Sequence, residues 1–219
     1  KDPYVSIKKK HNQLALQFYD EAKNIIEKAE DPLFEAIAVA ALGNTIDLGT
    51  HHKIDFINDI KTFTPDNLTI NDYELFKQSL QDTNHLLILL DNAGEIVFDR
   101  LLLEELPPKR VTLALRGSPV INDATVEDAE YTKLDGLVKI IDNGSDVPGT
   151  ILKVCSERFH QLFEQADLVI AKGQGNYETL SEEAREIFFL LKVKCPVIAR
   201  DIGCEPGALV VLEKRSSPD

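Results

Sequence analysis

The chain of 219 residues has no methionine, no tryptophan and only three cysteines. Cys155, Cys195 and Cys204 form neither a CxxC pair nor a zinc-binding spacing, and their odd number argues against a disulfide framework. We therefore expect reduced thiols that are buried as small apolar side chains in a cytoplasmic protein. Long apolar runs are also absent, and stretches such as Ile37 to Leu42 are far too short to span a bilayer.

Positive charge is scarce as well. Lys and Arg number 24 against 37 Asp and Glu, which gives a formal net charge of -13, and the longest basic run is Lys8 to Lys10. Because phosphate backbones repel such a chain, we expect no nucleic-acid partner. No signal-peptide pattern opens the chain, so we expect a soluble protein with no membrane partner. Since the chain starts at Lys1 and has no methionine, we expect that an N-terminal piece or modified methionines are missing from the sequence.

The N-terminal part of the chain has apolar residues at roughly helical spacing. Asp31 is a suitable N-cap for a helix that begins with Pro32. We expect residues 1–82 to form a strand-free helical subdomain or lid. The predicted helices run from Ser6 to Ala29, from Asp31 to Leu42 and from Phe63 to Leu80.

From Leu86 onward, short apolar runs alternate with amphipathic segments. This alternation predicts an α/β domain over residues 83–219, with a three-layer, doubly wound, mainly parallel sheet that follows the helical subdomain. The end of the chain, from Glu213 to Asp219, is expected to be a frayed tail. Predicted strands cover residues 86–90, 111–115, 137–141, 168–171 and 197–200, and predicted helices cover 96–106, 126–133, 150–165 and 177–191.

Polar side chains follow the predicted strands at the points where these end. Asp91 and Asn92 close one apolar strand, and Asp123 follows the next strand along the chain. Parallel strands place their carboxyl ends on one rim, where open α/β sheets bind ligands. Hard cations such as Mg²⁺ or Mn²⁺ take oxygen ligands of this kind. The alternative for Asp123 is an N-cap, because Asp-Ala-Thr-Val-Glu resembles the start of a helix.

Two basic residues follow or end predicted strands. Lys172 opens a Gly-rich turn before a helix, where backbone amides and its charge suit an anion, although an ordinary surface lysine is an equal alternative. The turn lacks the Walker A pattern, so a nucleoside triphosphate is not specifically indicated. Arg116 is placed to bind a phosphate bidentately or to form a salt bridge with Asp142.

A further turn, from Gly43 to Gly49, lies in the helical part of the chain. Its glycine, asparagine and aspartate content is typical of a turn. We expect Asn44 and Asp47 to face the rim if the helical part folds over the strand ends. The adjacent His51 and His52 are assigned no metal role.

Taken together, these turns resemble the motifs of the metal-dependent damage-control phosphatases, a family first described as domain of unknown function 89. The order and spacing of the motifs, from Gly43 to Tyr177, are more specific than any one of them. The small size of the chain and its Asn-Ala-Gly-Glu residues resemble the shorter prokaryotic branch of the family. The motifs are Gly43-Asn44-x-x-Asp47-x-Gly49, Asp91-Asn92-Ala93-Gly94-Glu95, Arg116-Gly117-x-Pro119-x-x-Asn122-Asp123-Ala124-Thr125, Asp142-Asn143-Gly144-Ser145 and Lys172-Gly173-x-Gly175-Asn176-Tyr177.

The resemblance implies a metal-dependent phosphatase that hydrolyses phosphate esters of sugars and other small metabolites. It implies that Asp91, Asn92 and Asp123 hold a divalent ion (Co²⁺, Ni²⁺, Mn²⁺ or Mg²⁺) and that Lys172 binds the substrate phosphate. These four residues are the expected catalytic groups. The expected substrate contacts are Asn44, Asp47, Glu95, Arg116, Gly173 and Asn176.

Some alternatives stay open. Asp91 either attacks the phosphate or binds a metal beside an activated water, and we favour water because the DxD pattern of a phosphoaspartate enzyme is absent. The family has also been proposed to contain carboxyl methyltransferases that use S-adenosylmethionine, but no Gly-rich loop of the usual form follows the strand that ends at Leu90. A protein that binds phosphometabolites without turnover is the third possibility.

Overall fold

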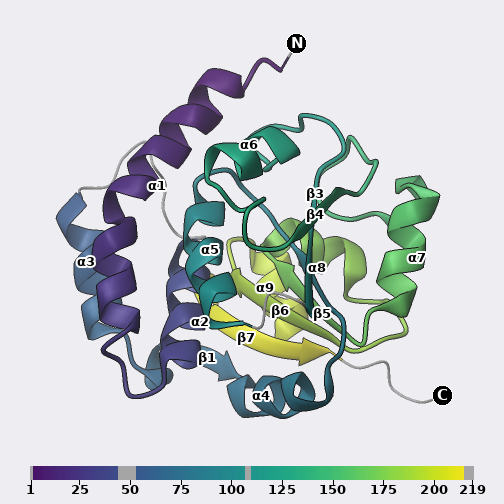
Figure 1. Cartoon of the computed structure of the whole chain (residues 1–219). Coiled ribbons are helices and arrows are strands. Elements are labelled where there is room, and N and C mark those ends of the chain that lie inside the picture. The colour runs from purple at the N-terminus through teal and green to yellow at the C-terminus, as the bar shows by residue number, and fades with distance from the viewer. Residues whose placement is uncertain (1, 44–52, 107–109, 215–219) are drawn as a thin grey trace.

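The chain forms a seven-stranded sheet between two layers of helices (Figure 1). The computed structural model describes residues 2–43, 53–106 and 110–214. The strands are β1 Leu68–Asn71, β2 Leu86–Leu89, β3 Val111–Leu115, β4 Lys139–Asp142, β5 Leu168–Lys172, β6 Ile187–Lys192 and β7 Leu209–Lys214. The helices are α1 Val5–Ile26, α2 Pro32–Gly43, α3 Lys53–Thr62, α4 Tyr73–Asp82, α5 Glu95–Glu105, α6 Val126–Tyr131, α7 Glu157–Gln165, α8 Gln174–Leu180 and α9 Pro196–Ile202, with 3₁₀ turns at Pro65–Asn67 and Leu152–Val154.

The strand order is β1-β7-β6-β5-β2-β3-β4. Strands β6, β5, β2, β3 and β4 run parallel to one another, whereas β7 is antiparallel to β6 and pairs in parallel with β1. The prediction of a mainly parallel α/β sheet is confirmed. From β2 the chain moves outward through β3 to β4 and then returns to β5 on the other side of β2. The order therefore reverses between β2 and β5, which is where such sheets bind ligands.

The central strands are almost wholly apolar because helices cover both faces of the sheet. On β2, Leu86 and Ile88 pack in the core beneath α1, α2 and α5, and Leu87 and Leu89 pack in the core beneath α7 and α8. Each strand therefore sends alternate side chains to opposite layers. Asp31 caps α2 as predicted, because its Oδ1 accepts a hydrogen bond from the Phe34 amide at 3.2 Å.

The prediction of a strand-free first eighty residues is wrong. The segment expected to form one helix, Phe63 to Leu80, instead contains a 3₁₀ turn, strand β1 and the larger part of α4. Strand β1 is an edge strand of four residues, and so short a strand carries too little alternation to stand out in a sequence. The proposed division of the chain between residues 82 and 83 stays a prediction.

The C-terminal third also differs from the prediction. The segment expected to be a single helix from Tyr177 to Leu191 contains α8, a turn and strand β6, because a short, continuously apolar run is typical of both a buried strand and a buried helix. The expected strand from Val197 to Arg200 lies within α9, which has Pro196 at its first position. Glu213 and Lys214 belong to β7 rather than to a frayed tail.

The three cysteines carry free thiols, but they are half-buried rather than fully buried. Across the described ranges, each helix is too short or too polar to cross a bilayer.

Candidate metal and phosphate site

Asp91, Asn92 and Asp123 lie together at the carboxyl end of the sheet. Asn92 and Asp123 form an isolated antiparallel bridge, and the amide of Ala124 donates to the carbonyl of Asp91 at 2.8 Å. These bonds attach the loop after β3 to the turn after β2. The structure thus brings the three predicted metal ligands together at the point where the strand order reverses, and their binding of a metal stays a prediction.

The carboxylates on this rim repel one another. The Asn92 amide nitrogen donates to Asp91 Oδ2 at 2.8 Å and to Glu95 Oε1 at 2.8 Å. Burial, together with the charges of Glu95 and Asp123, raises the pKa of Asp91. Burial also raises the pKa of Asp123, although the Arg116 guanidinium opposes this. A divalent cation would offset this repulsion, so the donor set fits a metal.

The arrangement of ligand types limits what kind of metal site is possible. Within residues 2–43, 53–106 and 110–214, no three His, Cys, Asp or Glu side chains are grouped as a metal centre. A metal on this rim would therefore need the Asn92 amide oxygen beside the carboxylates of Asp91 and Asp123. Such an oxygen-only set suits a hard divalent ion.

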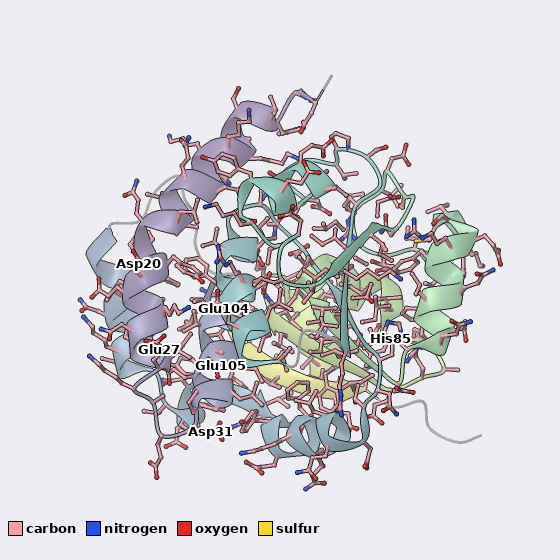
Figure 2. All side chains as sticks on the ribbon, viewed as in Figure 1. Asp20, Glu27, Asp31, His85, Glu104 and Glu105 are labelled. Carbon is pink, nitrogen blue, oxygen red and sulfur yellow. The ribbon has the colours of Figure 1, made fainter. Side chains whose placement is uncertain are left out.

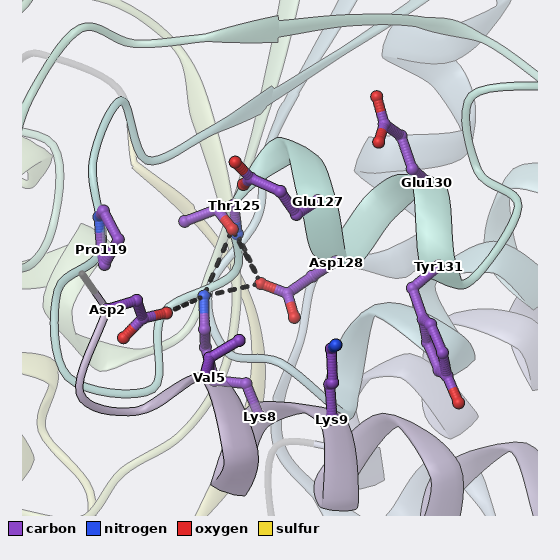
Figure 3. Close-up of a pocket in the computed structure, with 10 residues that line it drawn as sticks. All are labelled: Asp2, Val5, Lys8, Lys9, Pro119, Thr125, Glu127, Asp128, Glu130 and Tyr131. Carbon is purple, nitrogen blue, oxygen red and sulfur yellow. Dashed lines mark hydrogen bonds and ion pairs between the residues drawn. The ribbon is translucent and has the colours of Figure 1, made fainter.

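Gly94 makes the turn from β2 into α5 with a φ of 87°, a conformation that favours glycine. Its amide donates to Oδ1 of the buried Asn12 on α1 at 2.6 Å. Asn12 in turn donates to Asp128, which also accepts hydrogen bonds from Lys8 and Thr125 beside a cavity of about 410 Å³ (Figure 3). Helix α1 thus supports, from outside, the turn that follows Asp91 and Asn92. Sequence reasoning missed this contact because it joins residues 82 positions apart.

Arg116 is buried, and its guanidinium donates hydrogen bonds to side chains of the protein. Its Nε donates to Asp123 Oδ2 at 2.6 Å, and its two terminal nitrogens donate at 3.2 Å to Thr150 Oγ1 and Asn176 Oδ1. The salt bridge considered in the sequence is therefore made with Asp123 and not with Asp142. In this position the guanidinium holds a predicted metal ligand, and a phosphate contact by Arg116 stays untested.

Asn176 connects the ends of β2 and β5 from within the protein. Its amide nitrogen donates to the Leu90 carbonyl at 3.2 Å and to the Lys172 carbonyl at 2.7 Å. Its amide oxygen accepts from Arg116 and from Thr150 Oγ1 at 2.8 Å. The side chain is fully buried, so its observed role is to fix the two strand ends, and the predicted substrate contact stays untested.

Gly173 lies directly against Asp91. Its φ is 79°, and a Cβ atom at this position would lie 2.0 Å from Asp91 Oδ2. Only glycine therefore lets the turn after β5 approach the carboxylate at the end of β2. The two turns that sequence reasoning assigned to metal and to phosphate are in contact.

Lys172 is not a surface residue, because its side chain is 0 % exposed. Its Nζ donates to Asp99 Oδ1 at 2.6 Å and to the Ala40 carbonyl at 3.0 Å. Asp99 is a site residue that sequence reasoning missed. Its spacing was a usable signal, because Asp99 follows Glu95 by four positions on α5 and so lies on the same face of that helix.

Asn44 and Asp47 lie outside the described residues, so their predicted contact with the rim stays untested. The last described residue before them, Gly43, ends α2 and packs against Phe98 of α5, where a Cβ atom would lie 2.9 Å from Phe98 Cδ2. Helix α2 also supplies the Ala40 carbonyl that accepts a hydrogen bond from Lys172. Helix α2 therefore ends close to the site.

Comparison with known proteins agrees with these motifs. Residues 1–210 match the family model described as the damage-control phosphatase ARMT1-like domain. A damage-control phosphatase of Archaeoglobus fulgidus is 38% identical over 217 residues, which cover 95% of this chain and 75% of that protein. The damage-control phosphatase PH1575 of Pyrococcus horikoshii is 37% identical over 220 residues, with 98% and 75% covered.

The fold also matches that of a member of this family. The crystal structure of a DUF89 family protein from Pyrococcus horikoshii superposes with a TM-score of 0.87 at 36% identity, covering 98% of this chain and 76% of that one. A family model that spans nearly the whole chain, two relatives of the same description and a shared fold agree with one another. The chain therefore belongs to the ARMT1-like damage-control phosphatase family, and it is a phosphatase as its motifs predict.

Proposed function

We propose that the protein hydrolyses phosphate monoesters of small metabolites with a divalent metal held by Asp91, Asn92 and Asp123. The observation that carries this proposal is the contact between Gly173 and the Asp91 carboxylate. It brings the turn after Lys172, the expected phosphate-binding turn, against the expected metal ligands. The charges of Glu95 and Asp91 also act on the Lys172 ammonium, together with that of Asp99. A cation and an ammonium on the same rim are what a phosphate dianion requires.

The chain's own residues have distinct tasks in this proposal. Asp91 and Asp123 provide carboxylate oxygens, and rotation of the Asn92 amide by half a turn would bring its oxygen between Asp91 and Glu95, where its nitrogen now lies. A bound Mg²⁺, Mn²⁺, Co²⁺ or Ni²⁺ ion would polarise the phosphoryl group and lower the pKa of a water molecule. Lys172 offsets charge that develops on the phosphoryl oxygens.

We favour water over Asp91 as the nucleophile. Oδ2 of Asp91 accepts from Asn92 and lies against the backbone of Gly173, so this oxygen is already engaged. The family relationship favours phosphatase chemistry over methyl transfer. The relatives named damage-control phosphatases support phosphometabolites as the substrate class, and the acidic chain with free thiols supports a cytoplasmic setting.

Replacing Lys172 with Met tests the phosphate role. We expect KM for a generic phosphate ester and the inhibition constant of inorganic phosphate to rise about tenfold or more, because a charge-assisted hydrogen bond is lost. Metal affinity should change little, since an ammonium group cannot be a ligand. Steady-state kinetics at several Mn²⁺ concentrations measure both quantities.

The control is Lys23→Met, which removes a lysine of α1 that pairs with Glu104 at 2.6 Å. Glu104, labelled in Figure 2, lies near the C-terminal end of α5, whereas Glu95 at the rim begins this helix. This variant should keep the KM and the phosphate inhibition of the parent. If Lys172→Met also keeps them, Lys172 has no role in phosphate binding and the proposal fails at that residue.

A further inference from the structure

Lys172 points into the helical layer because of its place in β5. Leu168 and Ile170 of this strand pack in the core beneath α2 and α5, and alternation sends the side chain of Lys172 to the same face. A fully buried ammonium is costly unless charged and polar partners surround it. The two acceptors that the described residues provide are Asp99 on α5 and the Ala40 carbonyl on α2.

Two fixed acceptors determine the direction of the third N–H bond, because an ammonium group has three donors in tetrahedral geometry. Burial alone would lower the pKa of Lys172, but the nearby charges of Asp99, Glu95 and Asp91 raise it instead. The ammonium is therefore held charged by Asp99, with which it is in direct contact, and by the nearby carboxylates of the rim.

From this geometry we infer that Asp99 is a positioning residue that aims the Lys172 ammonium at the substrate phosphate and keeps it away from the metal-binding carboxylates. Without Asp99, the long and flexible lysine side chain would pair with Glu95 and Asp91, whose charges also raise the pKa of Lys172. The ammonium would then compete with the metal for these carboxylates and would no longer bind the phosphate. The inference rests on the proposed phosphate role of Lys172.

A pair of variants separates this role from simple support of the fold. Asp99→Ala removes the acceptor, and Asp99→Asn keeps an oxygen of nearly the same shape without the charge. With the full chain in Mn²⁺, calorimetric titration of inorganic phosphate should show binding weakened about tenfold by Asp99→Ala and less by Asp99→Asn. Titration of Mn²⁺ alone should show a weaker but measurable loss in Asp99→Ala, about threefold, because the freed ammonium occupies the rim.

The decisive comparison is made in the Lys172→Met background. If Asp99 acts through Lys172, adding Asp99→Ala in this background should change neither the phosphate affinity nor the Mn²⁺ affinity further. The double variant should also melt at a higher temperature than Lys172→Met, because it no longer contains a buried carboxylate without its lysine partner. Glu104→Ala is the matched control. It removes an ion pair of the same 2.6 Å length from the same helix and should lower the melting temperature without changing phosphate affinity.

Each result has one meaning. Phosphate and Mn²⁺ affinities equal to those of the parent in both Asp99 variants overturn the inference while leaving the proposed function intact. An equal loss in the presence and absence of Lys172 also overturns it, because Asp99 would then act independently. If Lys172→Met itself binds phosphate as the parent does, the phosphate role of Lys172 fails, and the inference fails with it. Asp99→Asn keeps the comparison available should Asp99→Ala not fold.

Discussion

Replacing Gly173 with Ala is expected to abolish turnover and to weaken Mn²⁺ binding by on the order of a hundredfold. The added methyl group would lie 2.0 Å from Asp91 Oδ2 and 2.3 Å from its Cγ, so either the carboxylate or the turn that carries Lys172 must move. A φ of 79° adds strain for any residue with a Cβ atom. Mn²⁺ titration and phosphate ester hydrolysis measure the two effects.

Gly203→Ala is the matched control for Gly173→Ala. Gly203 has a φ of 83° after α9, and among the described residues no atom beyond its chain neighbours lies within 4 Å of the position that its Cβ atom would occupy. This variant should lose about 1 kcal/mol of folding free energy through backbone strain and should keep its activity. Wild-type turnover in Gly173→Ala would show that the contact with Asp91 has no part in catalysis.

The second large effect is expected for Asp91→Asn. Turnover should fall at least about 10³-fold, because loss of the metal removes several kcal/mol of transition-state stabilisation. In the metal-free protein, however, the same change should raise stability at neutral pH, since burial and the charges of Glu95 and Asp123 penalise the ionised carboxylate. A residue that destabilises the fold but is needed for activity is typical of a functional site.

The pH dependence of folding stability tests whether Asp91 is a metal ligand or only supports the fold. Burial with the neighbouring charges raises the pKa of Asp91 to about 8, whereas the unfolded chain has the ordinary value. Between these values the folded state binds the extra proton, so the metal-free protein should lose stability as pH rises from about 4 to 8, by at most about 1.4 kcal/mol per pH unit. Asp91→Asn should remove much of this slope, and Mn²⁺ should stabilise only the parent.

Thermal melting with and without Mn²⁺ between pH 5 and pH 8 measures these effects. Asp142→Asn is the control, because Asp142 is an exposed carboxylate at the end of β4 and is not part of the proposed metal site. Its melting curves should follow those of the parent. An Mn²⁺-stabilised Asp91→Asn variant with parental turnover would contradict the assignment of Asp91.

The sequence was sufficient for the centre of the sheet and for the placement of the strand-end motifs. Strands β2, β3 and β5 are short, almost wholly apolar runs bounded by polar turns, and both features are local. Because parallel strands share a rim, Asp91 and Asp123 were predicted to lie at the same edge of the sheet. Strands β1, β6 and β7 were not predicted. A four-residue edge strand such as β1 and a nearly all-apolar strand such as β6 give no distinctive period.

The support around the site depends on contacts between distant segments. Asn12, Asp99 and Ala40 reach the rim from three helices, and the sequence does not show how these helices pack on the sheet. Arg116 is the opposite case, because its position was predicted correctly but its partner was not. Whether a strand-end arginine binds a phosphate or a neighbouring carboxylate depends on tertiary distances of a few ångströms, and here Asp123 lies 2.6 Å from Nε.

The central claim is that one rim holds both the metal and the phosphate. The most direct measurement is a crystal structure of the full chain grown with Mn²⁺ and inorganic phosphate, with the metal located by its anomalous scattering. We expect a single Mn²⁺ peak in contact with Asp91, Asn92 and Asp123, and a phosphate between that ion and the Lys172 ammonium. A Mn²⁺ peak on other residues, or a phosphate bound away from Lys172, would contradict the account.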